Sequence, residues 1–178
     1  QLTKIGGVLR GAKPDDPMAY RYSRMGQWLP LVSAPPTPAG DGKTLVPPPP
    51  AHLKARFESL VQSSDWLTLL RETDSLGAEY ILWLDPQRYV ATALAALGVT
   101  AIKAREEMLM QTALLLQRVP TLPKLSFSDG SPLADGPTQM WIDTDVTPVL
   151  SSGDGSGGGG AASALDEPIA EARGLAVK

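Results

Sequence analysis

The first candidate for chemistry is the glycine-rich stretch from Gly40 to Thr44. It ends in Gly-Lys-Thr, as a phosphate-binding loop does. That loop needs a glycine five positions before the second one, but Thr37 stands there. It also needs a strand before it and a helix after it, so that backbone N–H groups point at the phosphates. Because prolines flank the stretch on both sides, we predict a turn that binds no nucleotide.

Paired carboxylates are the second candidate. Asp143 and Asp145 have the Asp-x-Asp spacing that some transferases use to hold a divalent cation. Two carboxylates fill too few of the six or so oxygen positions that such a cation needs. Glu106 and Glu107 point about 100° apart on a helix, so they cannot face one another across a substrate. We therefore predict that Asp143 and Asp145 are solvated acids at a helix end, that no metal is bound, and that Glu106 and Glu107 do not form a glycosidase-type pair.

Nucleophilic catalysis has little support in this sequence. His52 is the only histidine, and no Gly-x-Ser-x-Gly turn presents a serine to it. The absence of cysteine removes disulfides, thiolate metal sites and cysteine nucleophiles together, and it is typical of a reducing compartment. We predict that the chain is not an enzyme and needs no cofactor.

Composition and charge are those of a globular chain. Of the 178 residues, 43% are apolar and 20% are charged, which allows a sizeable core. A formal charge of −3 gives no basic patch for nucleic acid. The longest uncharged run, residues 89–102, is shorter than the roughly 18–20 apolar residues that span a membrane. The chain starts at Gln1 without a signal-peptide pattern, and we expect it to be a fragment of a longer protein.

Helical periodicity and capping residues predict an all-α fold. The acidic caps Asp16, Asp65 and Asp85, two of them followed by proline, indicate helix starts at Pro17, Trp66 and Pro86, and Gly77 and Gly98 indicate helix ends. We expect a compact bundle of about five to six helices, over residues 17–29, 51–62, 66–76, 86–97, 100–118 and a short one from residue 137.

Three stretches are predicted to lie outside these helices. Residues 1–16 carry three glycines and little periodicity, so we expect an irregular N-terminal segment. Residues 30–50 contain 8 prolines in 21 positions, which predicts a Pro-rich extended arm. Apolar residues such as Leu31 and Val46 favour an arm docked on the core over the alternative of a plain linker. The alternating residues 125–128, before an Asp-Gly pair, predict a minor β-hairpin.

The distribution of glycine predicts the domain organisation. The regularly spaced apolar residues expected of a core end near Val146, and 6 of the 8 residues from 153 to 160 are glycine. We expect a helical middle domain over residues 17–146, a Gly/Ser-rich linker over residues 147–163, and the start of a truncated C-terminal helical domain over residues 164–178.

The helix predicted over residues 100–118 is apolar around more than one face. Its Met108, Met110, Leu114 and Leu115 widen the apolar stripe beyond what one neighbouring element covers. Such a helix is either central in the bundle or shared with a second subunit, and the sequence leaves both open. If it is shared, these four residues are the candidate self-association interface.

Six further residues are predicted to be structural anchors: Trp28, Trp66, Trp83, Asp85, Arg88 and Trp141. Each tryptophan adds a large buried area and one N–H group that needs a partner. Arg88, like Arg21 and Arg24, could pair with an acid such as Asp85 or stack on an aromatic ring.

Several short motifs follow one another in a distinctive order. They are Pro17-x-x-Tyr20-Arg21-x-x-Arg24, Gly42-Lys43-Thr44, Asp65-Trp66, Leu82-Trp83-Leu84-Asp85-x-Gln87-Arg88-Tyr89, Arg118-Val119-Pro120 and Leu125-x-Phe127-x-Asp129-Gly130. Each motif alone is weak. Together, over residues 17–143, they are similar to the middle region of the TssA (ImpA-related) proteins of bacterial type VI secretion. In this resemblance Pro86 stands where a helix-favouring residue is expected, which leaves open whether residues 80–97 form one helix or two.

The resemblance implies a non-enzymatic assembly factor. Family members help to organise the cytoplasmic baseplate and the contractile tail of the secretion machine, so the implied location is cytoplasmic and the implied partners are other baseplate or tail proteins. The resemblance also implies that the middle domain self-associates, most simply as a twofold dimer. The alternative hypothesis is a monomeric helical adapter that binds a peptide segment in a groove.

Overall fold

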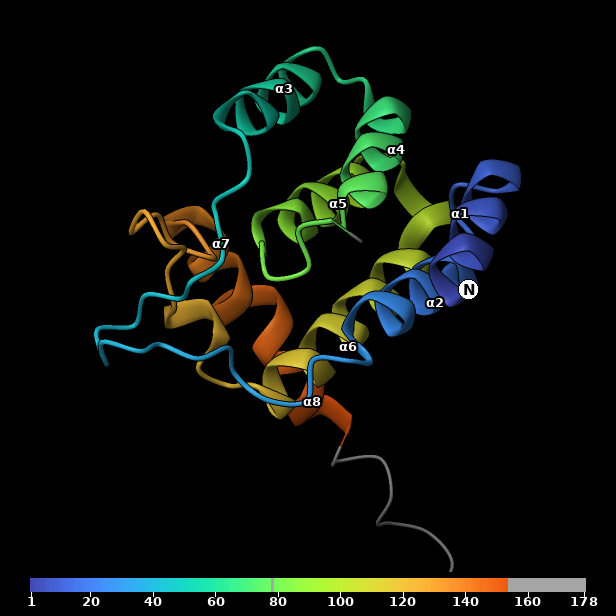
Figure 1. Cartoon of the computed structure of the whole chain (residues 1–178). Coiled ribbons are helices and arrows are strands. Elements are labelled where there is room, and N and C mark those ends of the chain that lie inside the picture. The colour runs from blue at the N-terminus through green and yellow to red at the C-terminus, as the bar shows by residue number, and fades with distance from the viewer. Residues whose placement is uncertain (78, 154–178) are drawn as a thin grey trace, which may run out of the picture.

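The computed structural model describes residues 1–77 and 79–153, most of which are helical (Figure 1). The α-helices are α1 (Leu2–Ala12), α2 (Pro17–Trp28), α3 (Ala51–Gln62), α4 (Trp66–Leu76), α5 (Asp85–Ala96), α6 (Ile102–Arg118), α7 (Gly136–Trp141) and α8 (Thr147–Gly153). They are joined in places by the 3-10 turns η1 (Gly98–Ala101) and η2 (Leu122–Lys124) and by a π-helical turn, η3 (Ile142–Val146). None of the described residues belongs to a β-strand, so the predicted all-α class is confirmed.

Capping side chains fix where several helices begin. Asp16 and Asp65 each accept a hydrogen bond from a backbone N–H of the following first turn, at 2.8 Å and 3.2 Å. Both acids thereby satisfy donors that the start of a helix leaves without a partner. Helix α5 starts at Asp85, and residues 80–84 before it are not helical. Residues 80–97 therefore contain a single α-helix.

Most of residues 1–16, which the sequence predicts to be irregular, form helix α1, so that prediction is wrong. The glycines that suggested an irregular segment instead allow two helices to pack very closely. A Cβ atom on Gly6 would lie 2.3 Å from Ser23 Oγ, and one on Gly26 would lie 2.6 Å from the backbone nitrogen of Thr3. The tight contact between α1 and α2 thus offsets the low helix propensity of glycine.

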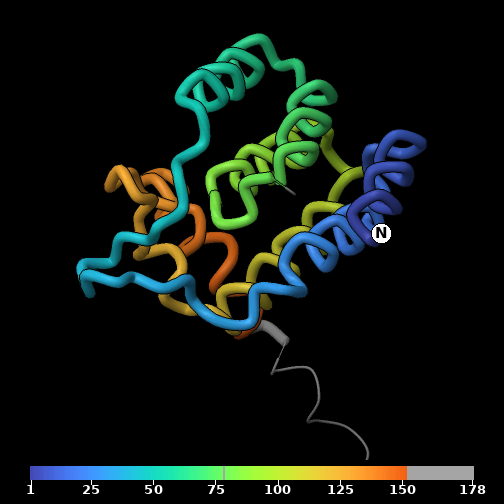
Figure 2. The backbone as a smooth tube through the Cα atoms, in the orientation of Figure 1, coloured from blue at the N-terminus to red at the C-terminus, as the bar shows by residue number. Residues whose placement is uncertain are grey.

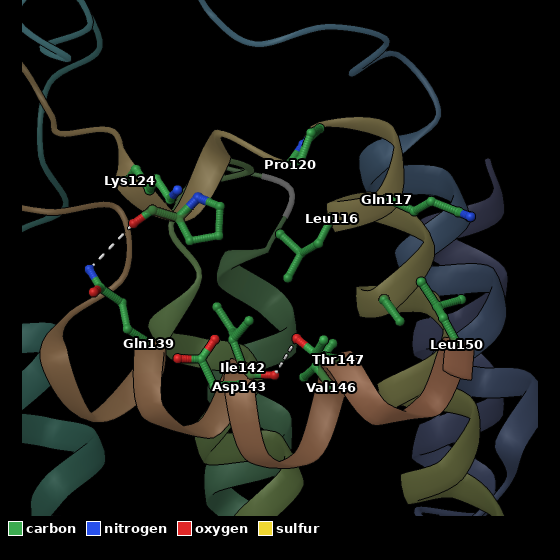
Figure 3. A pocket seen from close by; sticks show the side chains of 12 residues that line it. Leu116, Gln117, Pro120, Lys124, Gln139, Ile142, Asp143, Val146, Thr147 and Leu150 are labelled. Atoms are coloured by element: carbon green, nitrogen blue, oxygen red, sulfur yellow. Dashed lines mark hydrogen bonds between the residues drawn. The ribbon is translucent and has the colours of Figure 1, made fainter. Parts of the chain in front are cut away.

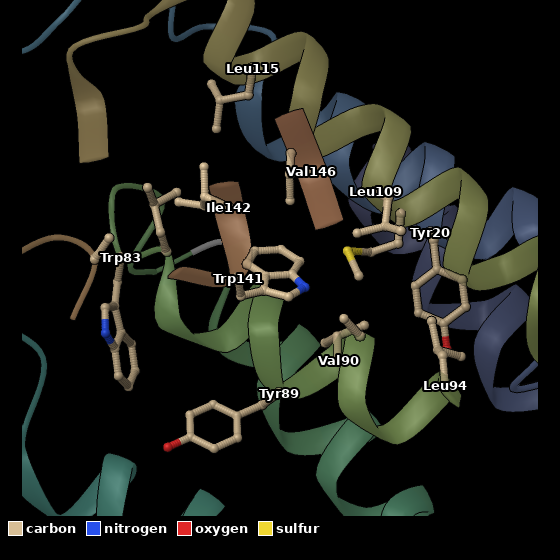
Figure 4. Packing of buried hydrophobic residues seen from close by; sticks show 14 of the residues in the cluster. Tyr20, Trp83, Tyr89, Val90, Leu94, Leu109, Leu115, Trp141, Ile142 and Val146 are labelled. Carbon is tan, nitrogen blue, oxygen red and sulfur yellow. The ribbon is translucent and has the colours of Figure 1, made fainter. Parts of the chain in front are cut away.

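Helix α6 lies at the centre of the bundle. Helix α2 runs alongside it with α1 on the outer side of α2, while α5 and the continuous α7–η3–α8 stretch pack on other sides of α6 (Figure 1). Buried side chains from these elements meet in one core (Figure 4), which includes Tyr20, Val90, Leu94, Leu109, Leu115, Trp141, Ile142 and Val146. A helix surrounded in this way needs apolar residues around most of its circumference.

Residues 29–50 connect α2 to α3 across the surface without helix or strand (Figure 2). Their main attachment is made by the backbone, since the Thr44 N–H donates to the carbonyl of Ser126 at 2.9 Å. Of the apolar residues expected to dock this segment, Leu31 packs against the core but Val46 is exposed. Backbone pairing therefore does more than apolar side chains to fix the path of this segment.

The β-hairpin predicted after residue 124 does not form strands. A turn is present, because the Phe127 N–H donates to the carbonyl of Ser131 at 2.7 Å, but the pairing is limited to isolated bridges. Pro132 has no N–H to extend a ladder. In addition, η2 and α7 lie close on either side and leave few residues for strands. These limits explain why the Asp-Gly turn forms without the predicted hairpin.

The helical unit extends further than the sequence indicates. Helix α8 occupies the first residues of the predicted 147–163 linker, and its Val149 and Leu150 pack against the core. The predicted end near Val146 is therefore too early, because the helix continues through the π-helical turn. The rest of the predicted linker and the predicted C-terminal domain, residues 164–178, lie outside the described residues.

Candidate functional site

The four residues predicted to form a self-association interface do not share one surface. Met108 and Leu115 are 0% exposed and belong to the core of a single chain, so they are not available to a partner. Met110 is half-buried, and Leu114 is 40% exposed. The wide apolar face of α6 mainly reflects its central position, and only Met110 and Leu114 remain as surface candidates.

The four tryptophans differ in their surroundings. Trp28, Trp83 and Trp141 are buried, and Trp66 is half-buried against the core. The Nε1–H of Trp28 donates to the carbonyl of Ile81 at 3.2 Å, whereas the Nε1 of Trp141 is buried and makes no hydrogen bond within the described residues. Three of the four thus lie inside the bundle, where a ring of this size stabilises packing.

Trp83 and Asp85 form one end of a buried polar network. The Trp83 Nε1–H donates to Asp85 at 3.0 Å, and the other carboxylate oxygen of Asp85 accepts from the backbone N–H of Asp135 at 2.9 Å. Asp85 therefore does not cap its own helix, as the sequence suggested, but joins the start of α5 to the start of α7. The ring of Trp83 also stacks on Phe57 of α3, with centroids 5.8 Å apart.

Asp135 forms the other end of this network. It caps α7 by accepting from the backbone N–H of Thr138 at 2.8 Å, and it accepts from Lys54 Nζ of α3 at 2.7 Å. Arg88 of α5 donates from Nε to Thr138 Oγ1 at 3.1 Å, and its guanidinium lies 3.7 Å from Asp135. Asp85 and Asp135 thus link α3, α5 and α7 to one another.

The two acids of the network differ in pKa. Burial raises the pKa of Asp85, although hydrogen bonds from the Asp135 backbone and from Trp83 oppose that shift. Burial would also raise the pKa of Asp135, but the hydrogen bonds from Lys54 and Thr138 outweigh it and hold the pKa below its ordinary value. Folding therefore shifts the protonation equilibrium of Asp85 toward the neutral form and that of Asp135 toward the charged form.

These opposite shifts predict opposite pH effects for two matched substitutions. A raised folded-state pKa means that Asp85 stabilises the fold below its ordinary pKa and loses that contribution as pH rises through the folded-state value. The lowered pKa of Asp135 means that it stabilises the fold above its ordinary pKa and loses that contribution as pH falls.

As the pH rises from about 3 to 6, the free energy of unfolding of Asp85→Asn should increase relative to that of the unsubstituted protein at the same pH. That of Asp135→Asn should decrease over the same range. Urea denaturation at a series of pH values measures both differences. Parallel pH dependence for the two variants would contradict the assignment.

A second buried charge network joins α1, α2, α4 and α5. Asp74 of α4 pairs with both Arg10 and Arg24, and it also accepts from Ser23 Oγ at 3.0 Å. The guanidinium of Arg24 donates to the side-chain oxygen of Gln87 at 3.1 and 2.9 Å. Burial lowers the pKa of Arg24 to about 10, so this side chain keeps its charge at neutral pH.

The sequence identified Arg24 as a motif residue, but it indicated neither its acidic partner Asp74 nor Arg10, which pairs with the same acid. Arg21, by contrast, lies at the surface and pairs with Glu107 of α6 at 2.6 Å. The signal that could have separated the two arginines is periodicity, since Arg24 shares the buried face of α2 with Tyr20. The identity of the acidic partner, 50 positions away, required the fold.

An open groove lies between the C-terminal half of α6 and the η3–α8 stretch (Figure 3). It has a volume of about 380 Å³. Figure 3 shows Leu116 pointing from one wall toward Ile142 on the other, with Val146 and Leu150 further along the second wall. The lining is apolar apart from Gln117, Lys124, Gln139, Asp143 and Thr147. A concave apolar lining with a few polar groups is typical of a binding site for apolar side chains.

Of the residues that the sequence put forward for chemistry, Asp143 alone lines this groove. Asp145 lies 3.4 Å from Arg105, and His52 is exposed at the start of α3. Residues 40–42 form bends and Lys43 makes an isolated bridge with Ser126, with no strand before them. Within residues 1–77 and 79–153, no three histidine, aspartate or glutamate side chains gather as they would around a metal ion.

A protein-family model matches residues 1–177, and the family is described as "Type VI secretion, EvfE, EvfF, ImpA, BimE, VC_A0119, VasJ". The chain belongs to this type VI secretion family. The comparison with curated proteins found no match.

In this member of the ImpA/VasJ family, the motifs that carry the sequence resemblance supply mainly structural side chains. Tyr20 and Arg24 lie in the core beside Asp74, and Trp83 and Asp85 lie in the network that ends at Asp135. The resemblance therefore follows the residues that hold the helices together. None of the helices in the described part of this family member has the length and hydrophobicity that a membrane span needs.

Proposed function

We propose that this domain is a non-enzymatic assembly module of the type VI secretion machine and that it acts by self-association in the cytoplasm. Family membership supports the secretion role. The observation that carries self-association is Leu114, which is 40% exposed in the C-terminal half of the central helix although most of the apolar residues around it are buried. Through this contact the domain would join copies of the protein beside its baseplate or tail partners.

The geometry of α6 favours a small twofold contact. Met110 and Leu114 lie one helical turn apart, so they fall on the same side of α6. In a twofold dimer each of these residues would meet its own counterpart or a near neighbour on the second copy. The short apolar strip of each copy would therefore be buried against the same strip of the other copy. Glu107 and Arg21, paired at one end of this strip, would lie at its polar rim.

Substitution of Leu114 tests this proposal. Leu114→Asp should convert a dimer of the full chain into a monomer, because two buried carboxylates would face one another across the contact. Leu67→Asp is a matched control, since Leu67 is also an exposed leucine but lies on α4. Sedimentation over a wide concentration range measures the outcome. An unsubstituted chain that stays monomeric, or equal effects of the two substitutions, would refute self-association through α6.

A second candidate function is a monomeric adapter that binds a peptide from a baseplate or tail protein. The groove between α6 and the η3–α8 stretch favours it, because its apolar walls suit the side chains of a bound segment. An adapter would remain monomeric, and baseplate or tail peptides would raise its melting temperature by mass action. The Leu114→Asp variant should bind such peptides normally, because Leu114 does not line the groove.

A further inference from the structure

The groove between α6 and the η3–α8 stretch has helical walls. Apart from Pro120, its lining residues come from α6, η2, α7, η3 and α8. Most backbone N–H and C=O groups of such elements already pair with one another. Pro120 and Pro123, which close the groove near η2, have no N–H group to donate. The groove therefore offers a partner apolar contact but few backbone hydrogen bonds.

A partner in this groove must satisfy the hydrogen bonds of its own backbone. The N–H and C=O groups of an extended peptide would lose water on the apolar walls without gaining partners. A helix pairs these groups internally and can bury one apolar side. The wall from Ile142 to Leu150 is roughly 12 Å long at the rise of a helix. Positions i, i+4 and i+7 of a partner helix cover roughly 10 Å, which fits this wall.

Two charges of opposite sign stand at one end of the groove. Lys124 and Asp143 both line it, and Figure 3 shows them on opposite sides, at the end farther from Leu150. Neither side chain takes part in an ion pair within residues 1–77 and 79–153. A helix seated between the walls would remove part of the water around both charges. It therefore needs an acidic side chain near Lys124 and a basic one near Asp143.

We propose that the groove binds an amphipathic helix of another protein. This helix places three apolar side chains between Leu116 and the η3–α8 wall, and it carries an acidic residue beside Lys124 and a basic residue beside Asp143. The inference rests on the adapter function proposed above and adds the chemistry of the partner. It does not depend on self-association, because neither Met110 nor Leu114 lines the groove.

Phage selection of short random peptides against the full chain tests the proposal. Enriched peptides should carry apolar residues at positions i, i+4 and i+7, with one acidic and one basic residue near the same end. The substitution Leu116→Asp should remove their binding. Proline-rich or strictly alternating sequences would indicate an extended partner and would overturn the proposal. A selection without a common pattern, or binding that survives Leu116→Asp, would overturn it as well.

Charge reversal gives a result even if Leu116→Asp does not fold. Lys124→Glu should weaken the binding of an enriched peptide by about tenfold or more, and exchange of the acidic residue of the peptide for lysine should restore it. Lys103→Glu is the matched control and should leave binding unchanged, because Lys103 is also exposed but does not line the groove. Equal weakening by the two substitutions would contradict a defined contact at Lys124.

Fluorescence anisotropy of a labelled enriched peptide separates a helix of another protein from a second copy of this chain. A single-site binding curve supports the proposal. A second copy in the groove would compete with the peptide, so the bound fraction would level off or fall as the chain concentration rises, and that result would overturn it. If enriched peptides bind but peptides of baseplate and tail proteins do not, the adapter function fails while the chemistry of the groove stands.

Discussion

Replacement of Asp74 by alanine should destabilise the protein by about 3–5 kcal/mol. Asp74 pairs with Arg10 and Arg24, and both the carboxylate and the Arg24 guanidinium are almost fully buried. Without the acid, Arg24 would keep its charge in the core with only the side-chain oxygen of Gln87 as a polar partner. The cost of this substitution is therefore dominated by the unpaired cation that it leaves behind and not by the lost contact alone.

The measurement is thermal and urea unfolding of the full chain, with an expected fall in melting temperature of about 6–20 °C. Asp74→Asn keeps the shape of the side chain and one acceptor oxygen, so it should be less damaging and gives a measurable value even if the alanine variant does not fold. Glu72→Ala on the same helix is the control. Glu72 pairs with Arg56 at the surface, so its loss should have a much smaller effect. Equal effects at positions 72 and 74 would show that burial does not set the strength of these pairs.

Two alanine substitutions in α1 should shift stability in opposite directions. Gly6→Ala should destabilise the protein by about 1–3 kcal/mol, because the new Cβ would lie 2.3 Å from Ser23 Oγ and 2.6 Å from the carbonyl oxygen of Ala19. The nearest backbone atoms cannot move aside without shifting α2. Gly11→Ala should stabilise it by about 0.5–1 kcal/mol, since nothing lies within 4 Å of a Cβ at that position.

Hydrogen exchange in α1 distinguishes undocking of the helix from a general loss of stability. In Gly6→Ala, the amides of α1 should exchange much faster than those of α6. In Gly11→Ala, they should exchange no faster than in the unsubstituted protein. A stabilising effect of Gly6→Ala would mean that α1 does not pack on α2 as closely as the structure shows.

Local chemistry was sufficient to predict most helices of this fold. Asp16-Pro17, Asp65 and Asp85-Pro86 mark helix starts, and Gly77 and Gly98 mark ends, because capping and proline geometry act within a few residues. The exceptions have non-local causes. Helix α1 was missed because its glycines reflect the closeness of α2, and the hairpin was overpredicted because the elements around it leave no room for strands.

The candidate site was less predictable than the fold. The apolar pattern of residues 100–118 correctly predicted a broad apolar face on α6. Periodicity cannot show which side of a helix is covered by the same chain and which side faces outward. Burial separates Met108 and Leu115 from Leu114. The groove could not be predicted at all, since Leu116 and Ile142 meet only when η2 reverses the chain between α6 and α7.

The pairing of α2 with α6 has a consequence for synthesis in the cell. Arg21 and its partner Glu107 are 86 positions apart, and a ribosome adding about 5–20 residues per second needs roughly 4–17 s to make that stretch. Throughout this delay the apolar side of α2, which includes Tyr20 and Trp28, is not yet covered by α6. The nascent chain should therefore be a client for chaperones until its central helix has emerged.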